Sequence, residues 1–165
     1  MPRLHIFIGS RSDLDAVKKS KMAEPLDAVG LNYEVHVCSA DRNPDELAQY
    51  VRDACEGGAE LFIGIAGLAA VLPGALASAS KMMVPVLGVP LDEHGIDSCL
   101  YKPPGVPVAT MGVGAVGLRN AAIFACQVLS QGSPSLEEAL RRYLDRSTKQ
   151  PEFNLEKSEI RPDSP

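Results

Sequence analysis

Short apolar runs alternate along the chain with segments in which apolar residues recur at helical spacing. The runs cover residues 4–8, 33–37, 61–65, 84–89 and 106–111. Helical spacing is clearest from Leu118 to Leu129, and another such series extends from Leu14 to Leu26. Alternation of strand and helix is typical of a doubly wound α/β domain with a largely parallel sheet. Such sheets bind ligands beyond the carboxyl ends of their strands.

Polar residues between the runs predict where helices begin. The first helix is expected directly after residues 9–13, with Ser12 and Asp15 forming a variant of the capping box. Asn43 as N-cap and Pro44 as first helical residue predict the start of the next helix.

Composition indicates one globular, cytoplasmic domain. The chain has 165 residues, of which 45% are hydrophobic and 22% charged, and this excludes a disordered chain or a coiled coil. A net charge of -5 disfavours nucleic acid as a partner. No segment is long enough to span a membrane. The four cysteines lack the spacing of a disulfide framework or a zinc site, so we expect reduced thiols and no metal.

Two polar loops that follow predicted strands contain candidate binding and catalytic residues. Residues 9–13 (GSRSD) place hydroxyls and backbone amides where they could hold a phosphate, although serine and aspartate there also suit a helix cap. Residues 39–44 (SADRNP) contain Asp41 and Arg42. A guanidinium suits a phosphate. Asp41 is either a proton donor, if its pKa is raised, or the ion-pair partner of Arg42.

Two further loops carry weaker signals. Residues 67–74 (GLAAVLPG) have no titratable side chain, so they either bind through backbone groups and shape an apolar pocket or form a close-packed turn. Residues 92–98 gather three carboxylates and His94, which are expected to form a solvated loop rather than a metal site. His5 and His36 fall within predicted strands, where we expect a structural role.

Residues 112–117 (GVGAVG) match the GxGxxG pattern of dinucleotide-binding proteins. That motif requires a further strand after its helix, with an acidic residue about 20 positions on. Here a polar tail follows instead, so NAD is not expected. Within residues 131–165 a helix is predicted around 135–147, and this region is either a frayed end or a helix that packs on another subunit.

The loops together resemble those of the PurE family, the carboxyaminoimidazole ribonucleotide mutases of purine biosynthesis. The matching segments are residues 9–13 for the family's GSxSD, 39–44 for SAHRTP and 67–74 for AGGAAHLPG, with shorter matches at 88–90, 95–98, 105–110 and 120–122. The resemblance extends in order from about residue 4 to 130. It implies a flavodoxin-like α/β/α fold for residues 1–130, with residues 131–165 packing on a neighbouring subunit of an octamer, and no metal or organic cofactor.

The resemblance also assigns roles to residues. The ribose phosphate would be held by Ser10, Ser12, Asp13 and Arg42, and Ser39 and Ala40 would line the base. Gly9 is a further substrate-binding residue. Gly67, Leu68, Ala69, Ala70, Val71 and Leu72 would enclose the migrating carboxyl group. The partners implied are a small nucleotide and carbon dioxide.

The chain departs from the family motifs at two chemical positions. The histidine of SAHR, the family's general acid and base, is Asp41, and the histidine of AAHLPG is Val71. We expect an enzyme that moves, adds or removes a carboxyl group on aminoimidazole ribonucleotide. The alternatives are a decarboxylase of a related heterocyclic nucleotide, with Asp41 as proton donor, and an inactive nucleotide-binding paralogue. His94 is a further candidate to replace the missing imidazole.

Overall fold

Five parallel strands form one sheet in a computed structural model of the chain, which describes residues 2–147. Their order is β2-β1-β3-β4-β5, the flavodoxin-like order. The strands are β1 (Leu4–Ile8), β2 (Tyr33–Val37), β3 (Leu61–Ala66), β4 (Val86–Pro90) and β5 (Ala109–Thr110). β1 and β3 are buried along their whole length, as their unbroken apolar runs predict. The predicted doubly wound α/β fold is confirmed.

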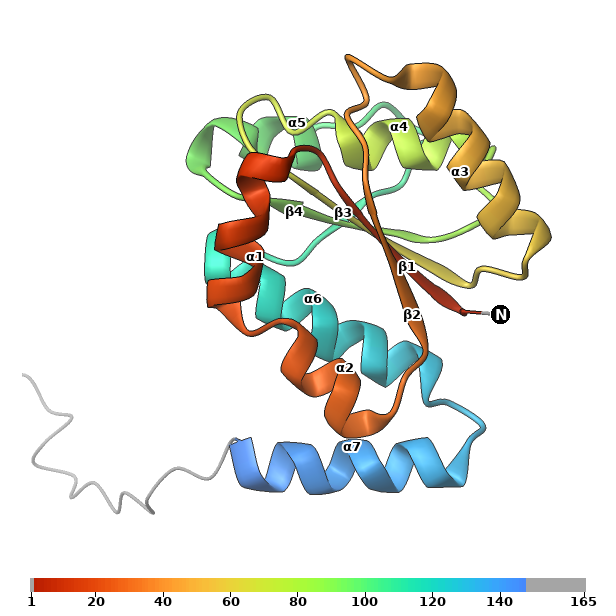
Figure 1. Ribbon diagram of the computed structural model, residues 1–165, viewed down its shortest axis with the longest axis vertical. Helices are drawn as coiled ribbons and strands as arrows, with labels where there is room; N and C mark the ends of the chain where they lie inside the picture. The colour runs from red at the N-terminus through yellow and green to blue at the C-terminus, as the bar shows by residue number, and fades with distance from the viewer. Residues whose placement is uncertain (1, 148–165) are drawn as a thin grey trace, which may run out of the picture.

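Helices cover both faces of the sheet (Figure 1). They are α1 (Leu14–Ser20), α2 (Ala23–Val29), α3 (Pro44–Glu56), α4 (Leu72–Ala79), α5 (Ile96–Leu100), α6 (Gly114–Leu129) and α7 (Pro134–Ser147). One apolar core joins α1, α2 and α6 to the face of Leu4, Ile6 and Ile8. The other joins α3 and α4 to the face of Phe7 and Phe62. Alternate residues of β1 therefore enter opposite cores.

The first helical segment differs from its prediction. It is broken at Lys21, whose φ of 59° lies in the left-handed region, so α1 ends at Ser20 and α2 begins at Ala23. Met22 and Leu26 are nevertheless buried in one core, which explains why the apolar spacing extended across the break. The expected capping box is also wrong. Ser10 caps a short 3₁₀ turn, Arg11–Asp13, where its Oγ accepts from the Ser12 amide.

Other boundaries shift by a few residues. Asn43 precedes α3 as expected, but its side chain makes no capping hydrogen bond. The fourth strand begins at Val86 instead of residue 84, and the fifth is paired over only Ala109 and Thr110. β5 lies at the edge of the sheet, so it has only one neighbouring strand, β4, to pair with.

The GVGAVG segment has a packing role at the start of α6. A Cβ at Gly117 would collide with the carbonyl oxygen of Gly112 and come within 3.1 Å of the Val89 side chain. Gly112 itself has a φ of 100°. The glycines therefore allow α6 to approach β4 closely. The segment follows β5, the last strand of the sheet, so the further strand that a dinucleotide fold requires is missing from residues 2–147.

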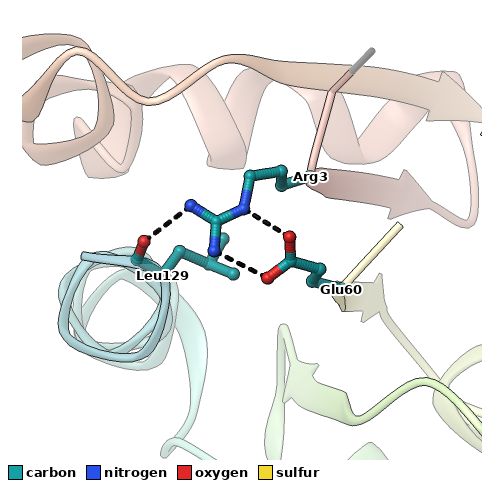
Figure 2. A network of polar contacts seen from close by, with 3 residues as sticks. All are labelled: Arg3, Glu60 and Leu129. Atoms are coloured by element: carbon teal, nitrogen blue, oxygen red, sulfur yellow. Dashed lines mark hydrogen bonds and ion pairs between the residues drawn. The ribbon is translucent and has the colours of Figure 1, made fainter. Parts of the chain in front are cut away.

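Arg3 connects three elements at the end of the sheet opposite the carboxyl ends of the strands (Figure 2). Its guanidinium donates two hydrogen bonds to the Glu60 carboxylate and a third, of 2.9 Å, to the carbonyl oxygen of Leu129. Leu129 is the last residue of α6, so its carbonyl has no partner within the helix. Arg3 thus joins the starts of β1 and β3 to the end of α6.

α7 packs against α2 and α6 of its own chain. Leu140 and Tyr143 are buried there, and Arg119 of α6 donates to the Tyr143 hydroxyl over 3.0 Å. Contact of this helix with a neighbouring subunit stays a prediction, and residues 148–165 lie outside the described residues. No helix within residues 2–147 is long and apolar enough to cross a membrane.

Candidate functional site

Loops from the carboxyl ends of four strands surround one cavity of about 560 Å³. Except for His94, its lining contains every site residue predicted from the sequence: Gly9, Ser10, Ser12, Asp13, Ser39, Ala40, Asp41, Arg42, Gly67, Leu68, Ala69, Ala70, Val71 and Leu72. Ala66 and Asp92 complete it. The loops lie together because β2, β1 and β3 are adjacent and parallel. This is the edge at which parallel sheets bind ligands.

In the loop after β1, polar groups form hydrogen bonds with one another. Ser10 Oγ accepts hydrogen bonds from the Ser12 amide and from Ser12 Oγ, at 3.3 and 2.8 Å. Asp13 is partly buried beside them, and this burial raises the pKa of its carboxyl group. Hydrogen bonds from Ser12 and Ser10 and the charge of Arg42 oppose the shift, whereas the charge of Asp92 adds to it.

The loop after β2 presents Arg42 to the cavity. Ser39 Oγ accepts from the Arg42 amide over 3.2 Å, which shapes the turn before α3. Asp41 and Arg42 are both exposed in the single chain. Among residues 2–147 no ion pair forms between them, so that interpretation of Asp41 is wrong. Arg42 acts electrostatically on Asp13 of the neighbouring loop instead.

The loop after β3 is held by Asp92. One carboxylate oxygen of Asp92 accepts from the Leu68 amide over 3.1 Å, and the other accepts from the His94 amide over 3.0 Å. Leu68 and Ala70 have φ values of 53° and 44°, in the left-handed region that costs an ordinary residue roughly 1–2 kcal/mol. The backbone of this loop is therefore fixed by its surroundings rather than by its own preference.

Asp92 lines the cavity, although its sequence pattern did not predict a place there. Its signal was its place directly after a buried strand, but the Leu68 amide that it holds is 24 residues away in the sequence. His94 is exposed and is absent from the cavity lining. The structure therefore places Asp92, not His94, at the cavity.

A second, more open hollow adjoins the first. It is lined by Ala40, Asp41, Val71, Gly74, Ala75, Ser78, Lys102, Pro103 and Val106. Asp41 and Val71 line both hollows. The two positions at which the chain departs from the family motifs thus lie at the boundary between them. The lysine of this wall, Lys102, lies close over Gly74, where a Cβ would come within 2.6 Å of its Nζ.

Comparison with known proteins identifies the family. The family model described as AIR carboxylase matches residues 3–150. The chain belongs to the AIR carboxylase, or PurE, family. Similar PurE-family proteins include the N5-carboxyaminoimidazole ribonucleotide mutase of Pyrococcus abyssi, which is 43% identical over 149 residues, 87% of this chain and 82% of that protein. The mutase of Pseudomonas aeruginosa is 42% identical over 149 residues, 87% of this chain and 89% of that protein.

A solved PurE structure supports the fold. The PurE of Treponema denticola superposes with a TM-score of 0.76 at 22% sequence identity, covering 90% of this chain and 92% of that one. The flavodoxin-like fold that the resemblance implies is thereby confirmed, and the family itself is shown by the family model and the sequence relatives.

Proposed function

We propose that this PurE-family protein is an enzyme of purine biosynthesis that moves, adds or removes a carboxyl group on aminoimidazole ribonucleotide. The observation that carries the proposal is that the three motif loops surround one cavity at the carboxyl ends of adjacent strands. Relatives at 43% and 42% identity are named N5-carboxyaminoimidazole ribonucleotide mutases.

The ribose phosphate of the substrate would lie between the first two loops. Ser10 and Ser12 offer hydroxyl donors there, and Arg42 offers a guanidinium that can bind two phosphate oxygens at once. Asp13 lies beside them with a raised pKa. A carboxyl group that protonates more readily repels a phosphate less, and in its protonated form it donates a hydrogen bond to it.

The base would lie beside the start of the loop after β2, and the transferred group would lie beside the loop after β3. Ser39 and Ala40, in the loop that follows β2, would line the base, and the segment from Gly67 to Leu72 would enclose carbon dioxide. Apart from its backbone amides this segment is apolar. An apolar wall favours neutral carbon dioxide over a charged carboxylate.

Asp41 is proposed to move the proton. In the mutase direction a protonated Asp41 would give its proton to the exocyclic nitrogen as the bond between this nitrogen and the carboxyl carbon breaks, so that carbon dioxide is released and Asp41 becomes a carboxylate. The ring carbon then forms a bond to carbon dioxide, and the carboxylate of Asp41 accepts the proton that this carbon loses. In the reverse reaction, a protonated Asp41 delivers a proton to the ring carbon when carbon dioxide leaves that carbon.

One observation favours a second candidate, a decarboxylase of a related heterocyclic nucleotide. Val71, where the family motif has histidine, is 38% exposed and lines the cavity. A methyl surface at that place disfavours a bound carboxylate product. Release of carbon dioxide would then prevail over its recapture, with Asp41 as the proton donor.

The assembly and location of the protein are also proposals. An octamer and a cytoplasmic site of action are expected from the resemblance and the composition. Large apolar side chains exposed on the single chain, among them Met83, Tyr101 and Val116, support self-association.

The test follows a labelled carboxyl carbon by NMR. The purified protein is given carboxyaminoimidazole ribonucleotide labelled at its carboxylate, beside the variant Asp41→Asn. Movement of the label between ring carbon and exocyclic nitrogen supports the mutase, and loss of the label as carbon dioxide alone supports the decarboxylase. We expect Asp41→Asn to slow turnover by about 10²–10⁴-fold with nucleotide affinity largely unchanged. Nucleotide binding without turnover in either form would contradict an enzyme and support the inactive paralogue.

A further inference from the structure

Three potential metal ligands converge on β1 and β2, on the face of the sheet covered by α3. His5 Nδ1 lies 3.1 Å from His36 Nε2, and each nitrogen lies 3.9 Å from an oxygen of Glu34. The ligand atoms of the three residues all lie within 4.8 Å of one another. None of the three lines the nucleotide cavity, so this cluster is separate from the proposed reaction.

The sheet register produces this convergence. His5 pairs with Glu34, and His36 pairs with Phe7 two residues further along β1. Alternate residues of a strand point to the same side, so Glu34 and His36 project on the side of His5. Parallel pairing of β1 and β2 is therefore sufficient to place two imidazoles and one carboxylate together.

The geometry is close to that of a divalent metal site. Zinc binds imidazole nitrogen and carboxylate oxygen at about 2.0–2.2 Å, which places two ligands of a tetrahedral ion roughly 3.3 Å apart. The observed separation of 3.1 Å between the two nitrogens is close to this value. Two histidines and one glutamate are also a known set of protein ligands for zinc with one open position.

Burial prepares the histidines to act as ligands. The side chains of His5 and His36 are only 5% and 10% exposed, whereas that of Glu34 is 53% exposed, which leaves a route from solvent. His36 stacks on Phe7 at 4.6 Å and lies 5.2 Å from the Tyr50 ring, so its position is fixed. Burial also lowers the pKa of both histidines, which favours the neutral imidazole that metals bind.

The buried polar atoms are incompletely satisfied by protein groups. No well-formed hydrogen bond reaches the buried His5 Nε2 within residues 2–147, although a backbone hydrogen bond with Pro2 acts on the pKa of the same ring. Between His5 Nδ1 and His36 Nε2 only one proton can be shared, since two N–H groups would repel each other at this distance. A cation that accepts both lone pairs removes this constraint.

We propose that His5, Glu34 and His36 form a binding site for a divalent transition metal of the zinc type, with solvent completing the coordination. The metal takes the place of the proton shared between the two rings, and this proton moves to the other nitrogen of its own ring, so that both imidazoles stay neutral. It joins the edge strand β2 to β1 through side chains, in addition to their backbone pairing. The site does not depend on the proposed nucleotide chemistry.

The test uses metal-free full-length protein prepared with a chelator and titrated with Zn²⁺ and Co²⁺. We expect one equivalent of Zn²⁺ to bind and raise Tm, and Co²⁺ to give visible absorption bands without a thiolate charge-transfer band. His36→Gln should weaken Zn²⁺ binding by at least about 10-fold. The matched control is His94→Gln, since His94 is exposed and outside the cluster.

The exposed ligand Glu34 supplies a second variant in case substitution of buried His36 prevents folding. Glu34→Gln should weaken Zn²⁺ binding while the metal-free protein keeps its circular dichroism spectrum. The proposal is overturned if the wild type fails to bind Zn²⁺ at micromolar concentrations, or if the variants that fold bind as tightly as the wild type. A thiolate band with Co²⁺ would also overturn it, because the cysteines would then be the ligands.

Discussion

Asp13 is the residue of the cavity whose pKa is raised by burial. A carboxyl group with a raised pKa in the folded chain destabilises that chain at pH values where it is ionised. Asp13→Asn should therefore stabilise the ligand-free protein at pH 7. Because Asp13 is only partly buried, the expected gain is below about 1 kcal/mol.

The pH dependence of this effect distinguishes it from a change in packing. The gain should shrink as the pH falls through the raised pKa of the native carboxyl group and should vanish below the unfolded value of about 3.9, where both states are protonated. Denaturant unfolding at both pH values measures it, and Asp15→Asn, on an exposed residue of the same segment, is the control. An equal gain at pH 7 and at low pH would show that ionisation of Asp13 is not the cause.

Gly117 is the residue at which α6 approaches the loop after β5 most closely. An added Cβ would collide with the Gly112 carbonyl, a backbone group that cannot rotate away. Gly117→Ala should therefore lower the free energy of unfolding by about 1–3 kcal/mol, although alanine favours a helix more than glycine does. Thermal unfolding tests this beside Asn120→Ala, an exposed change in the same helix. Equal stability of the two variants would contradict the close approach.

Individual site residues could be predicted to different extents from the sequence. Ser10, Asp13 and Arg42 were found because each lies in a short motif directly after an apolar strand. Asp92 was missed because its role depends on the Leu68 amide, which is distant in sequence. The convergence of His5, Glu34 and His36 was missed for a similar reason, since it arises only once β1 and β2 pair in their register.

At the scale of elements, the guanidinium of Arg3 joins the sheet to a helix end. Its contact with Glu60 lowers the pKa of that carboxyl group, chiefly through the hydrogen bonds that Arg3 donates. A double-mutant cycle of Arg3→Met and Glu60→Gln should give a coupling of about 0.5–1 kcal/mol at pH 7, since both side chains are partly exposed. The more exposed pair of Glu138 and Arg142 should couple more weakly.

This coupling should depend on pH and on salt. A lowered pKa means that Glu60 stabilises the folded chain above its unfolded pKa of about 4.3 and loses this effect as the pH falls through the folded value. High salt should also reduce the coupling. A coupling that stays constant from pH 7 to pH 3 would show that the charge of Glu60 does not contribute.

Element boundaries were less predictable than element types. Apolar spacing from Leu14 to Leu26 indicated one helix, because both halves bury residues in the same core. The break at Lys21 leaves that spacing nearly intact, so the apolar pattern does not indicate the break. β5 was predicted too long for a different reason: its apolar residues pack beneath neighbouring elements beyond the two residues that are paired.

At the scale of the whole molecule, α6 exposes apolar side chains on the side away from the sheet. Val116 and Phe124 are two helical turns apart and thus share a face. If this face is covered in the proposed oligomer, Phe124→Glu should reduce the assembly, because a charge would be buried without a partner. Light scattering measures the molar mass, with Gln49→Glu, an exposed change on α3 at the other face of the sheet, as control. A wild-type monomer, or a variant of unchanged mass, would contradict this.

The overall architecture was the most predictable level. Alternation of apolar runs with helical segments predicts the five strands and their parallel pairing. The division of α1 from α2 was not predicted, and α5 was expected to be part of a loop. The order of the strands came from the resemblance of the loops to those of a known family. Sequence patterns alone do not predict the strand order, since each buried strand presents a similar apolar surface to either neighbour.

The strand order also affects how the chain folds as it is synthesised. β1 is made first, yet it pairs with β2 on one side and β3 on the other. All five of its residues are buried in the finished protein. One edge of this apolar strand therefore stays unpaired in the growing chain until Ala66 has left the ribosome. During that interval this edge of β1 is open to aggregation or to a chaperone, and a chain stopped before β3 leaves the edge without a partner strand.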